Sequence, residues 1–223
     1  MTGPAYQSFT QWYSQGNLAP YVRSMKSPGG VLNLLETEQP AGDMSGPPLP
    51  EFSLYQDMLG GSRVTANFGA GNFSAVSEKG GIFVAAPDVA NTVLVDKDHR
   101  IRALSFPVAQ WQDVLDETSD GRFSWEYPQL HAGQLRAPII QSALRNLWAL
   151  CDEEGAPSRL LARAAGFEIL AALCRLGGAP LMLAKGGLAP WAERRCLELM
   201  RERLSEDISL DELAAEAQLS PFH

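Results

Sequence analysis

Few side chains in this sequence are placed for catalysis. The three histidines, His99, His131 and His223, are too far apart to form the closely spaced imidazole pair that many transition-metal sites use. Gly69-Ala-Gly71 precedes a predicted strand rather than a helix, so we interpret its glycines as turn residues and not as a phosphate-binding loop. The sequence also has no nucleophile elbow. It therefore predicts no catalytic residue, no metal site, no cofactor and no enzymatic activity.

Several aromatic and polar side chains are instead suited to bind a small molecule. In one predicted strand Arg63, Thr65 and Asn67 alternate with apolar residues, so one face of that strand is polar. This face either lines a pocket or simply meets water, and the alternation alone does not decide between them. The two tryptophans among the candidates would act as lids. The predicted ligand-binding residues are Trp12, Tyr55, Arg63, Asn67, His99 and Trp111.

Short predicted strands with regularly spaced turns must position these side chains. One or two strands are expected between 21 and 36 around the turn Ser27-Pro-Gly-Gly30, and 38–50 is expected to be a loop because it is rich in proline. This spacing of short strands indicates a sandwich or barrel, whose mouth is the usual place for a small ligand. The further strands are predicted at 52–58, 63–68, 72–76, 81–85, 91–95 and 99–106.

The N-terminal segment carries aromatic residues at helical spacing. Tyr6, Phe9 and Tyr13 share one face if this segment is a helix. Two interpretations remain open. The rings either pack on the following domain, or the segment forms an arm that closes over a ligand.

The chain after Pro107 is predicted to be helical. Helices are expected at 107–117, 135–150 and 158–176, and the last two, joined by a short loop, should form an antiparallel hairpin. Both are apolar over more than one stripe, so they either pair with a second copy of the chain or only cover the barrel. The residues predicted to form a homodimer are Ile140, Leu144, Leu147, Leu161, Phe167 and Leu170.

The C-terminal stretch 188–223 has the order of a helix-turn-helix. A first helix starts at Pro190, and Ser209 with Glu212 three residues later has the spacing of a capping box that opens a second helix. Ser220 and Pro221 then mark the start of another helix, in the place where a recognition helix would begin.

This stretch closely resembles the start of the DNA-binding region of the AraC family of bacterial transcription regulators. The matching pieces are GGLAPW at 186–191, EDISLDELAAEAQLS at 206–220 and SPFH at 220–223, and 78–87 resembles the family's turn into a strand ended by proline. The resemblance implies an α+β chain in three parts: a cupin-like jelly-roll β-barrel with a helical hairpin over 1–180, a linker over 181–187, and the first DNA-binding helices over 188–223. It implies a regulator whose effector, bound in the barrel of a homodimer, alters presentation of the DNA-binding regions. The alternative is a cupin-type enzyme or small-molecule-binding protein.

The charge of the chain bears on its DNA contacts. The sequence has 18 basic and 26 acidic residues, a formal net charge of −8, and 188–223 holds four arginines against eight carboxylates. Since a duplex binder needs positive charge against phosphates, we expect this chain to be a fragment of a longer protein and DNA to be a partner of the intact protein only. The effector class stays open among sugars, aromatic acids, amino acids, cyclic dinucleotides or none.

The remaining composition indicates a cytoplasmic protein. No apolar run approaches the ~20 residues that a membrane span requires, and no secretory leader is apparent. Cys151, Cys174 and Cys196 have no metal-binding spacing, and their odd number argues against a disulfide framework. We therefore expect a soluble protein with reduced thiols, without a membrane partner.

Overall fold

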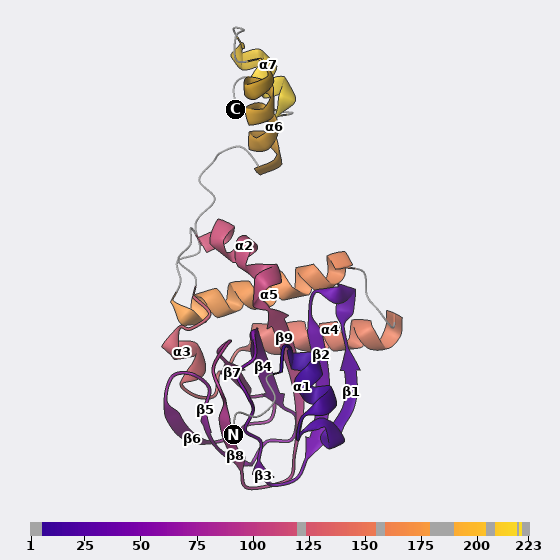
Figure 1. The fold of residues 1–223 in the computed structure, drawn as a ribbon, viewed down its shortest axis with the longest axis vertical. Helices are drawn as coiled ribbons and strands as arrows, with labels where there is room; N and C mark the ends of the chain where they lie inside the picture. Colours follow the sequence, from indigo (N-terminus) through magenta and orange to yellow (C-terminus); the bar gives the residue numbers. More distant parts are fainter. Residues whose placement is uncertain are drawn as a thin grey trace. The chain divides into compact units, whose positions relative to one another are not determined.

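Two antiparallel β-sheets face each other in the computed structural model, which describes residues 6–119, 124–154, 159–178, 190–203, 208–217 and 219 (Figure 1). The chain divides into two units, Met1–Leu181 and Met182–His223. The predicted linker at 181–187 lies outside the described residues. The first sheet has the order β1 (Val22–Lys26), β2 (Asn33–Gln39), β9 (His99–Pro107), β4 (Glu51–Asp57), β7 (Ile82–Ala85). The second has the order β3 (Gly42–Asp43), β8 (Thr92–Val95), β5 (Arg63–Asn67), β6 (Asn72–Val76).

The five-stranded sheet is buried on both faces. Its strand pairing aligns one row of apolar residues on the face toward the helices: Leu34, Leu104, Leu54 and Val84. The next residue of each strand points the opposite way because side chains alternate along a strand. That second row faces the four-stranded sheet and consists of Leu35, Ala103, Tyr55 and Phe83.

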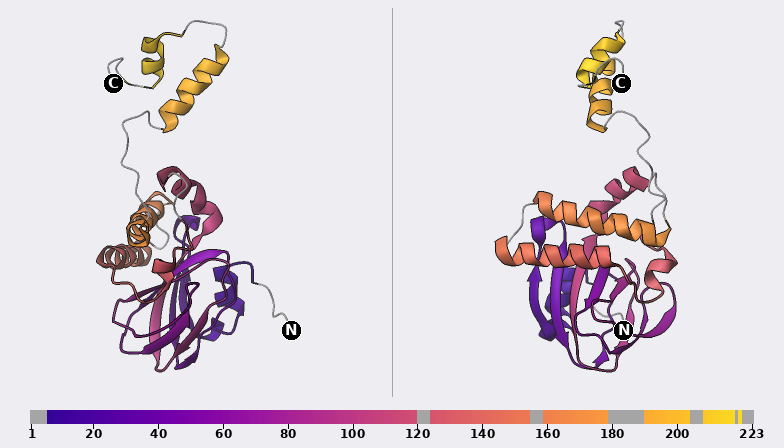
Figure 2. Two further views of the ribbon diagram at one scale, coloured as in Figure 1. Left: turned by 90° about the vertical axis from the view of Figure 1, so that its left-hand side faces the viewer. Right: turned by 180° about the vertical axis from the view of Figure 1, so that it is seen from behind.

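Helices cover the outer face of the five-stranded sheet. Figure 2 shows α4 (Pro138–Glu154) and α5 (Arg159–Gly177) side by side across the strands. Helix α2 (Val108–Ser119) leaves β9 and buries Trp111, whose Nε1 donates to the carbonyl of Val31 at 2.9 Å. Helix α5 approaches this ring at Gly166, where an added Cβ would lie 2.3 Å from Trp111 Cη2. The packing of α5 against α2 therefore requires a residue without a side chain at this position.

An electrostatic contact joins the same sheet face to α4. The guanidinium of Arg102 on β9 lies 4.5 Å from the ring centroid of Trp148, and its Nε donates to Glu36 at 2.8 Å. Lys26 on β1 forms an ion pair with Asp152 at the end of α4. These side chains face the helices, so their charges lie on the opposite side of the sheet from the second sheet.

The prediction of an α+β fold with a cupin-like pair of antiparallel sheets followed by helices is confirmed. The six strands predicted between 52 and 106 all occur within about two residues of their expected bounds. Besides the short 3-10 helices η1 (Ala19–Tyr21) and η2 (Pro28–Gly30), two elements were not predicted: the short strand β3 inside the expected loop 38–50, and α3 (Pro128–His131). Both are too short to show a periodic apolar pattern, so tertiary contacts define them. The N-terminal helix α1 spans Phe9–Gln15 and is capped by Ser8, which accepts from Gln11 N at 3.1 Å.

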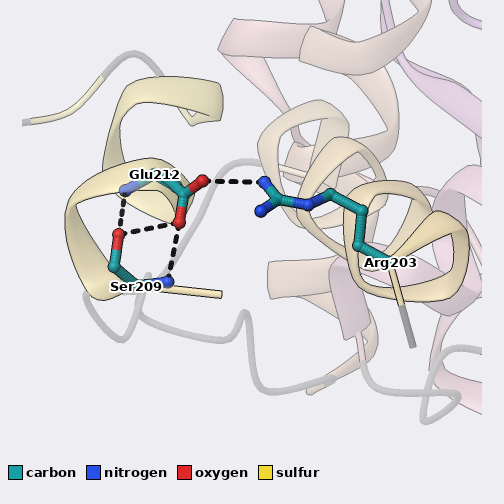
Figure 3. A network of polar contacts seen from close by, with 3 residues as sticks. All are labelled: Arg203, Ser209 and Glu212. Atoms are coloured by element: carbon teal, nitrogen blue, oxygen red, sulfur yellow. Dashed lines mark hydrogen bonds and ion pairs between the residues drawn. The ribbon is translucent and has the colours of Figure 1, made fainter. Parts of the chain in front are cut away.

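The second unit contains α6 (Pro190–Glu202) and α7 (Leu210–Glu216). The predicted capping box is present: Glu212 N donates to Ser209 Oγ at 3.2 Å, and Ser209 N donates to Glu212 Oε2 at 2.9 Å (Figure 3). Arg203, just after α6, donates to Glu212 Oε1 at 2.7 Å. The pKa of the Glu212 carboxyl is lowered to about 2, first by Arg203 and then by the Ser209 N–H and hydroxyl. One carboxylate thus caps α7 and ties it to α6.

Candidate functional site

A cavity of about 70 Å³ lies between the two sheets of the first unit. The strands β2, β4 and β9 form one wall, β5 and β8 form the facing wall, and α1 covers one side. The cavity exceeds the space that a single water molecule requires. Concave sites of this kind are where small ligands commonly bind.

Polar side chains from three neighbouring strands gather in this cavity. Gln39 on β2 and His99 on β9 are cross-strand partners, and Thr37 lies two residues before Gln39 on the same face. All three are buried. Asn91, which precedes β8, adds an amide whose Oδ1 is buried without a hydrogen-bond partner in the described part of the chain. Since a buried carbonyl oxygen without a partner costs free energy, Asn91 is poised to accept from a guest molecule.

The imidazole of His99 lines the cavity in its neutral form. Burial lowers the pKa of its imidazole, and the Lys97 carbonyl and the Asp57 carboxylate oppose that shift only in part. Nδ1 lies 3.1 Å from the carbonyl oxygen of Lys97, so a neutral ring that donates there keeps Nε2 as an acceptor.

Asp57, the carboxylate in the cavity wall, is committed to local structure. Its Oδ1 accepts from the backbone N–H of Leu59 at 2.9 Å and of Gly60 at 3.0 Å, and its Oδ2 accepts from the Ser77 hydroxyl. These three bonds hold the turn after β4 against the end of β6. Asp57 therefore shapes the cavity rather than offering a free carboxylate to it.

Aromatic rings from α1 close one side of the cavity. Trp12 and Tyr13 both line it, and Tyr6 packs edge-on against Trp12 with 4.8 Å between ring centroids. The helix is fixed to β4 by Phe9 N, which donates to Glu51 Oε1 at 3.0 Å. Burial raises the pKa of the Tyr13 phenol well above its usual value, and the neighbouring Tyr55 adds to this shift. The N-terminal aromatic residues thus pack on the domain, and the same packing makes α1 a cover of the cavity.

The structure brings three of the six predicted ligand-binding residues together in the cavity, namely Trp12, Tyr55 and His99. The other three lie elsewhere. Arg63 is exposed on the outer face of β5, so the polar face of that strand meets water. Asn67 accepts from the N–H groups of Gly69 and Gly71 and stabilises a turn. Trp111 was expected as a lid but is buried among the helices, because its indole fills the space between α2 and α5.

Sequence reasoning missed Tyr13, Thr37, Gln39 and Asn91, which also line the cavity. The alternation of Leu35, Thr37 and Gln39 does place these three residues on one face of a strand. Because Glu36 and Glu38 make the opposite face of this strand polar as well, the pattern could not indicate which face lines a cavity.

His131, which was not predicted to bind a ligand, lies outside the cavity. His131, at the end of α3, is buried, with Nδ1 2.9 Å from the Val84 carbonyl oxygen and Nε2 2.7 Å from that of Trp125. A neutral ring donates to one of these oxygens and an imidazolium to both. His131 ties α3 to β7 and does not reach the cavity. Among the residues that the structure describes, no three His, Cys, Asp or Glu side chains are grouped to hold a metal ion.

The helical hairpin places the predicted dimer residues in two groups. Ile140, Leu144, Leu147 and Leu170 are buried within the chain's own core, so they are not available to a second copy. The prediction that these four residues form the dimer interface is therefore wrong, because the apolar stripe of α4 and Leu170 of α5 pack in the core of the same chain. Leu161 and Phe167 remain exposed on α5, together with Leu160, of which 77% is accessible.

Within the described ranges, no helix is long and apolar enough to cross a bilayer.

Comparison with known proteins finds similarity only at the level of solved structures, since no protein family and no curated protein matches the sequence. The chain is similar to a crystal structure of the AraC-like transcriptional activator CuxR, with 14% identity and a TM-score of 0.47 over 96% of this chain and 81% of that one. It is also similar to the Schizosaccharomyces pombe Cnp3 cupin domain, with 16% identity and a TM-score of 0.33 over 42% of this chain and 69% of that one. An RmlC-like cupin protein from Desulfovibrio desulfuricans matches with 12% identity and a TM-score of 0.31, over 40% of this chain and 85% of that one. The cupin-like fold of the first unit rests on its own strand order in two facing sheets.

Proposed function

We propose that this chain is the effector-sensing part of an AraC-like transcription regulator. The observation that carries the proposal is the cavity between the sheets, where buried Gln39, His99 and the unpartnered Asn91 Oδ1 lie beside aromatic rings. A fold that needed the sheets only as a scaffold would fill this space with apolar side chains. The C-terminal motifs that resemble the AraC family supply the link to transcription.

The described residues of the cavity suit binding better than catalysis. Its carboxylate, Asp57, accepts three hydrogen bonds from its own turn, and its histidine stays neutral. General acid–base catalysis needs a group with a proton-transfer partner within hydrogen-bond reach of the reacting atoms. Asp57 and His99 do not form such a pair, so the proposal assigns no catalytic residue.

In this proposal two copies of the chain form a homodimer through α5. Its exposed residues Leu160, Ala164 and Phe167 follow each other at spacings of four and three, which is the spacing of a helix–helix seam. The apolar side chains of Leu160 and Phe167 gain from being covered by a second copy. DNA is a partner of the intact protein, through a helix beginning at Ser220 and Pro221, which lie outside the described residues.

An effector can act through this arrangement only if it binds one conformation better than another. The strand β9 offers a connection, since His99 faces the cavity and Arg102, three residues later, packs on Trp148 of α4. A shift of β9 on ligand binding would therefore be passed to α4 of the helical hairpin through the contact between Arg102 and Trp148.

A thermal-shift screen of the chain against small molecules tests the sensing function. A ligand at a hundredfold its dissociation constant stabilises the folded state by about 2.7 kcal/mol, which raises the melting temperature of a domain of this size by roughly 5–11 °C. Hits should vanish in a Gln39→Leu variant and persist in Thr65→Val, a matched change on the exposed face of β5. Hits that persist equally in both variants would place the ligand outside the cavity.

The alternative function, a cupin-type enzyme, is separated by metal analysis of the purified protein. Stoichiometric transition metal that is lost on His99→Gln would favour the enzyme. Retention of ligand binding by metal-stripped protein would favour the sensor.

A further inference from the structure

We infer that the cavity between the sheets takes an uncharged ligand that offers hydrogen-bonding groups beside an apolar face, and that it excludes organic anions. This inference rests on the proposed sensing function and specifies the chemical class of its effector. It is carried by the charges around the cavity, the hydrogen-bonding groups in its wall and the aromatic rings that close it.

Among the described residues that line the cavity, none is a lysine or an arginine. Of the cations nearest in sequence to the cavity residues, Arg63 and Arg100 are exposed, and two others are engaged elsewhere. Arg102 points to the helix side of the sheet, where it meets Trp148 and Glu36, and Lys97 donates to the carbonyl of Gly61 at 3.0 Å. A carboxylate or phosphate that entered the cavity would lose its hydration without gaining a counter-charge, which costs several kcal/mol.

The titratable groups of the cavity increase this penalty. Asp57 lines the wall, and Glu51 lies close enough that its charge adds to the effect of burial, which is the main cause of the raised pKa of Tyr55. His99 does not compensate for them, because burial lowers the pKa of its ring and keeps it neutral near pH 7. The electrostatic field of Asp57 and Glu51 therefore opposes a further negative charge on a ligand.

A cationic ligand lacks a free partner as well. Asp57 is the carboxylate among the lining residues, and its two oxygens already accept hydrogen bonds from Leu59, Gly60 and the Ser77 hydroxyl. These three bonds use most of the acceptor capacity of the carboxylate and fix it in the turn after β4, so little of that capacity is left for an amine. Aromatic rings such as those of Trp12 and Tyr13 attract cations more strongly at a desolvated site than at an exposed one, so a cationic ligand is the main competing outcome of the test.

The neutral groups of the cavity have the complementary chemistry. The Thr37 hydroxyl and the Gln39 amide can donate and accept, and Asn91 Oδ1 is an acceptor that the described chain leaves unpaired. Trp12, Tyr13 and Phe68 supply flat apolar surface. An alcohol, an amide or a polyol with one apolar face satisfies both sets of groups at once.

The test measures binding of two ligand triads, each with a neutral, an anionic and a cationic member built on the same ring. One triad is 2-phenylethanol, phenylacetate and 2-phenylethylamine; the other is methyl glucoside, glucuronate and glucosamine. Dissociation constants are measured on the whole chain at pH 7.5 by calorimetry and by Trp12 fluorescence, the latter in a variant whose other tryptophans are replaced by Phe. We expect the neutral member of at least one triad to bind at least tenfold more tightly than its acid and its amine.

Variants locate the binding and separate the two proposals. Gln39→Leu should weaken the neutral ligand at least tenfold, whereas Thr65→Val should not change it. Tighter binding of the acid or the amine, abolished by Gln39→Leu, would overturn the neutral-ligand inference and support the sensing function. Absence of binding by all six compounds would count against the sensing function and remove the basis of the inference.

Discussion

Gln39 and His99 face each other across the ladder between β2 and β9, and both side chains are buried in the cavity between the sheets. The pair stands where a β-sandwich would normally place two apolar residues. Burying an amide opposite an imidazole lowers stability unless their hydrogen-bonding groups find partners. The position of this pair is therefore the clearest structural sign of a binding site.

The neutral state of His99 predicts a specific pH dependence. Because burial lowers the pKa of the folded ring below the ordinary 6.5, the unfolded chain takes up a proton first as the pH falls. Stability should therefore decrease from about pH 6.5 down to the lowered pKa. Urea unfolding at pH 7.5 and 5.5 should show that the free energy of unfolding falls less between these pH values in His99→Gln than in the parent chain. The raised pKa of Glu51 acts in the opposite direction, but it is common to both proteins. Equal losses would contradict a buried neutral His99.

The position of Trp12 over the cavity depends on Gly16. A Cβ at residue 16 would lie 2.1 Å from Trp12 Cε3, far inside contact distance, while its backbone angles suit other residues. Gly16→Ala should displace the indole and weaken ligand binding by about tenfold, or roughly 1.4 kcal/mol. Gly133→Ala is the matched control, since a Cβ there meets no atom within 4 Å. Unchanged Trp12 fluorescence and affinity in Gly16→Ala would disprove the role of Trp12 as a cover.

Two neighbouring isoleucines on α4 should respond differently to truncation. Ile140 is 0% exposed and packs in the core, whereas Ile139 is 51% exposed. Ile140→Ala should lower the free energy of unfolding by about 2–5 kcal/mol, and Ile139→Ala should change it by about 0.5 kcal/mol or less. Chemical denaturation measures both values. If Ile139→Ala lowered the free energy of unfolding strongly and Ile140→Ala only slightly, α4 would be rotated about its axis from the orientation described.

The exposed face of α5 should control the oligomeric state. Leu160→Glu places a charge in the proposed seam, so a dimer should shift to monomer in sedimentation equilibrium, with unchanged far-ultraviolet circular dichroism. Leu59→Glu changes an equally apolar residue, 52% exposed on the turn after β4, and should leave the dimer intact. A dimer that survives Leu160→Glu would remove α5 from the interface.

Glu212 should titrate far below an ordinary glutamate. Its pKa of about 2 means that the stability it gives to the α6–α7 pair is complete above about pH 4.5 and is lost as the pH falls toward 2. Carboxyl carbon shifts followed by NMR report this titration directly. Arg203→Gln should raise the pKa of Glu212, because the first cause of the shift is then absent. Glu198→Gln on α6 controls for the loss of one charge, and a Glu212 titration near 4.5 in the parent chain would exclude the network of Figure 3.

The sequence by itself determined the helices and strands with strong local signals. Glycine and proline turns bounded the strands between Glu51 and Pro107, and Ser209 with Glu212 marked the start of α7. These signals are local because turn conformations and helix caps depend on residues only a few positions apart. The same signals led to a sandwich or barrel of short strands followed by helices, and the resemblance to the AraC family implied that this barrel is cupin-like.

Only the tertiary structure decided which side chains share a site. Trp12 and Trp111 are similar as isolated residues, yet one lines the cavity and the other fills the helical core. Thr37 and Gln39 could not be selected from their strand because the residues that alternate with them, the half-buried Glu36 and the exposed Glu38, are polar as well. A sheet that is covered on both faces carries no sequence difference between the side that meets helices and the side that encloses a cavity. The distinction arises from contacts between segments far apart in the chain, which period-two patterns do not encode.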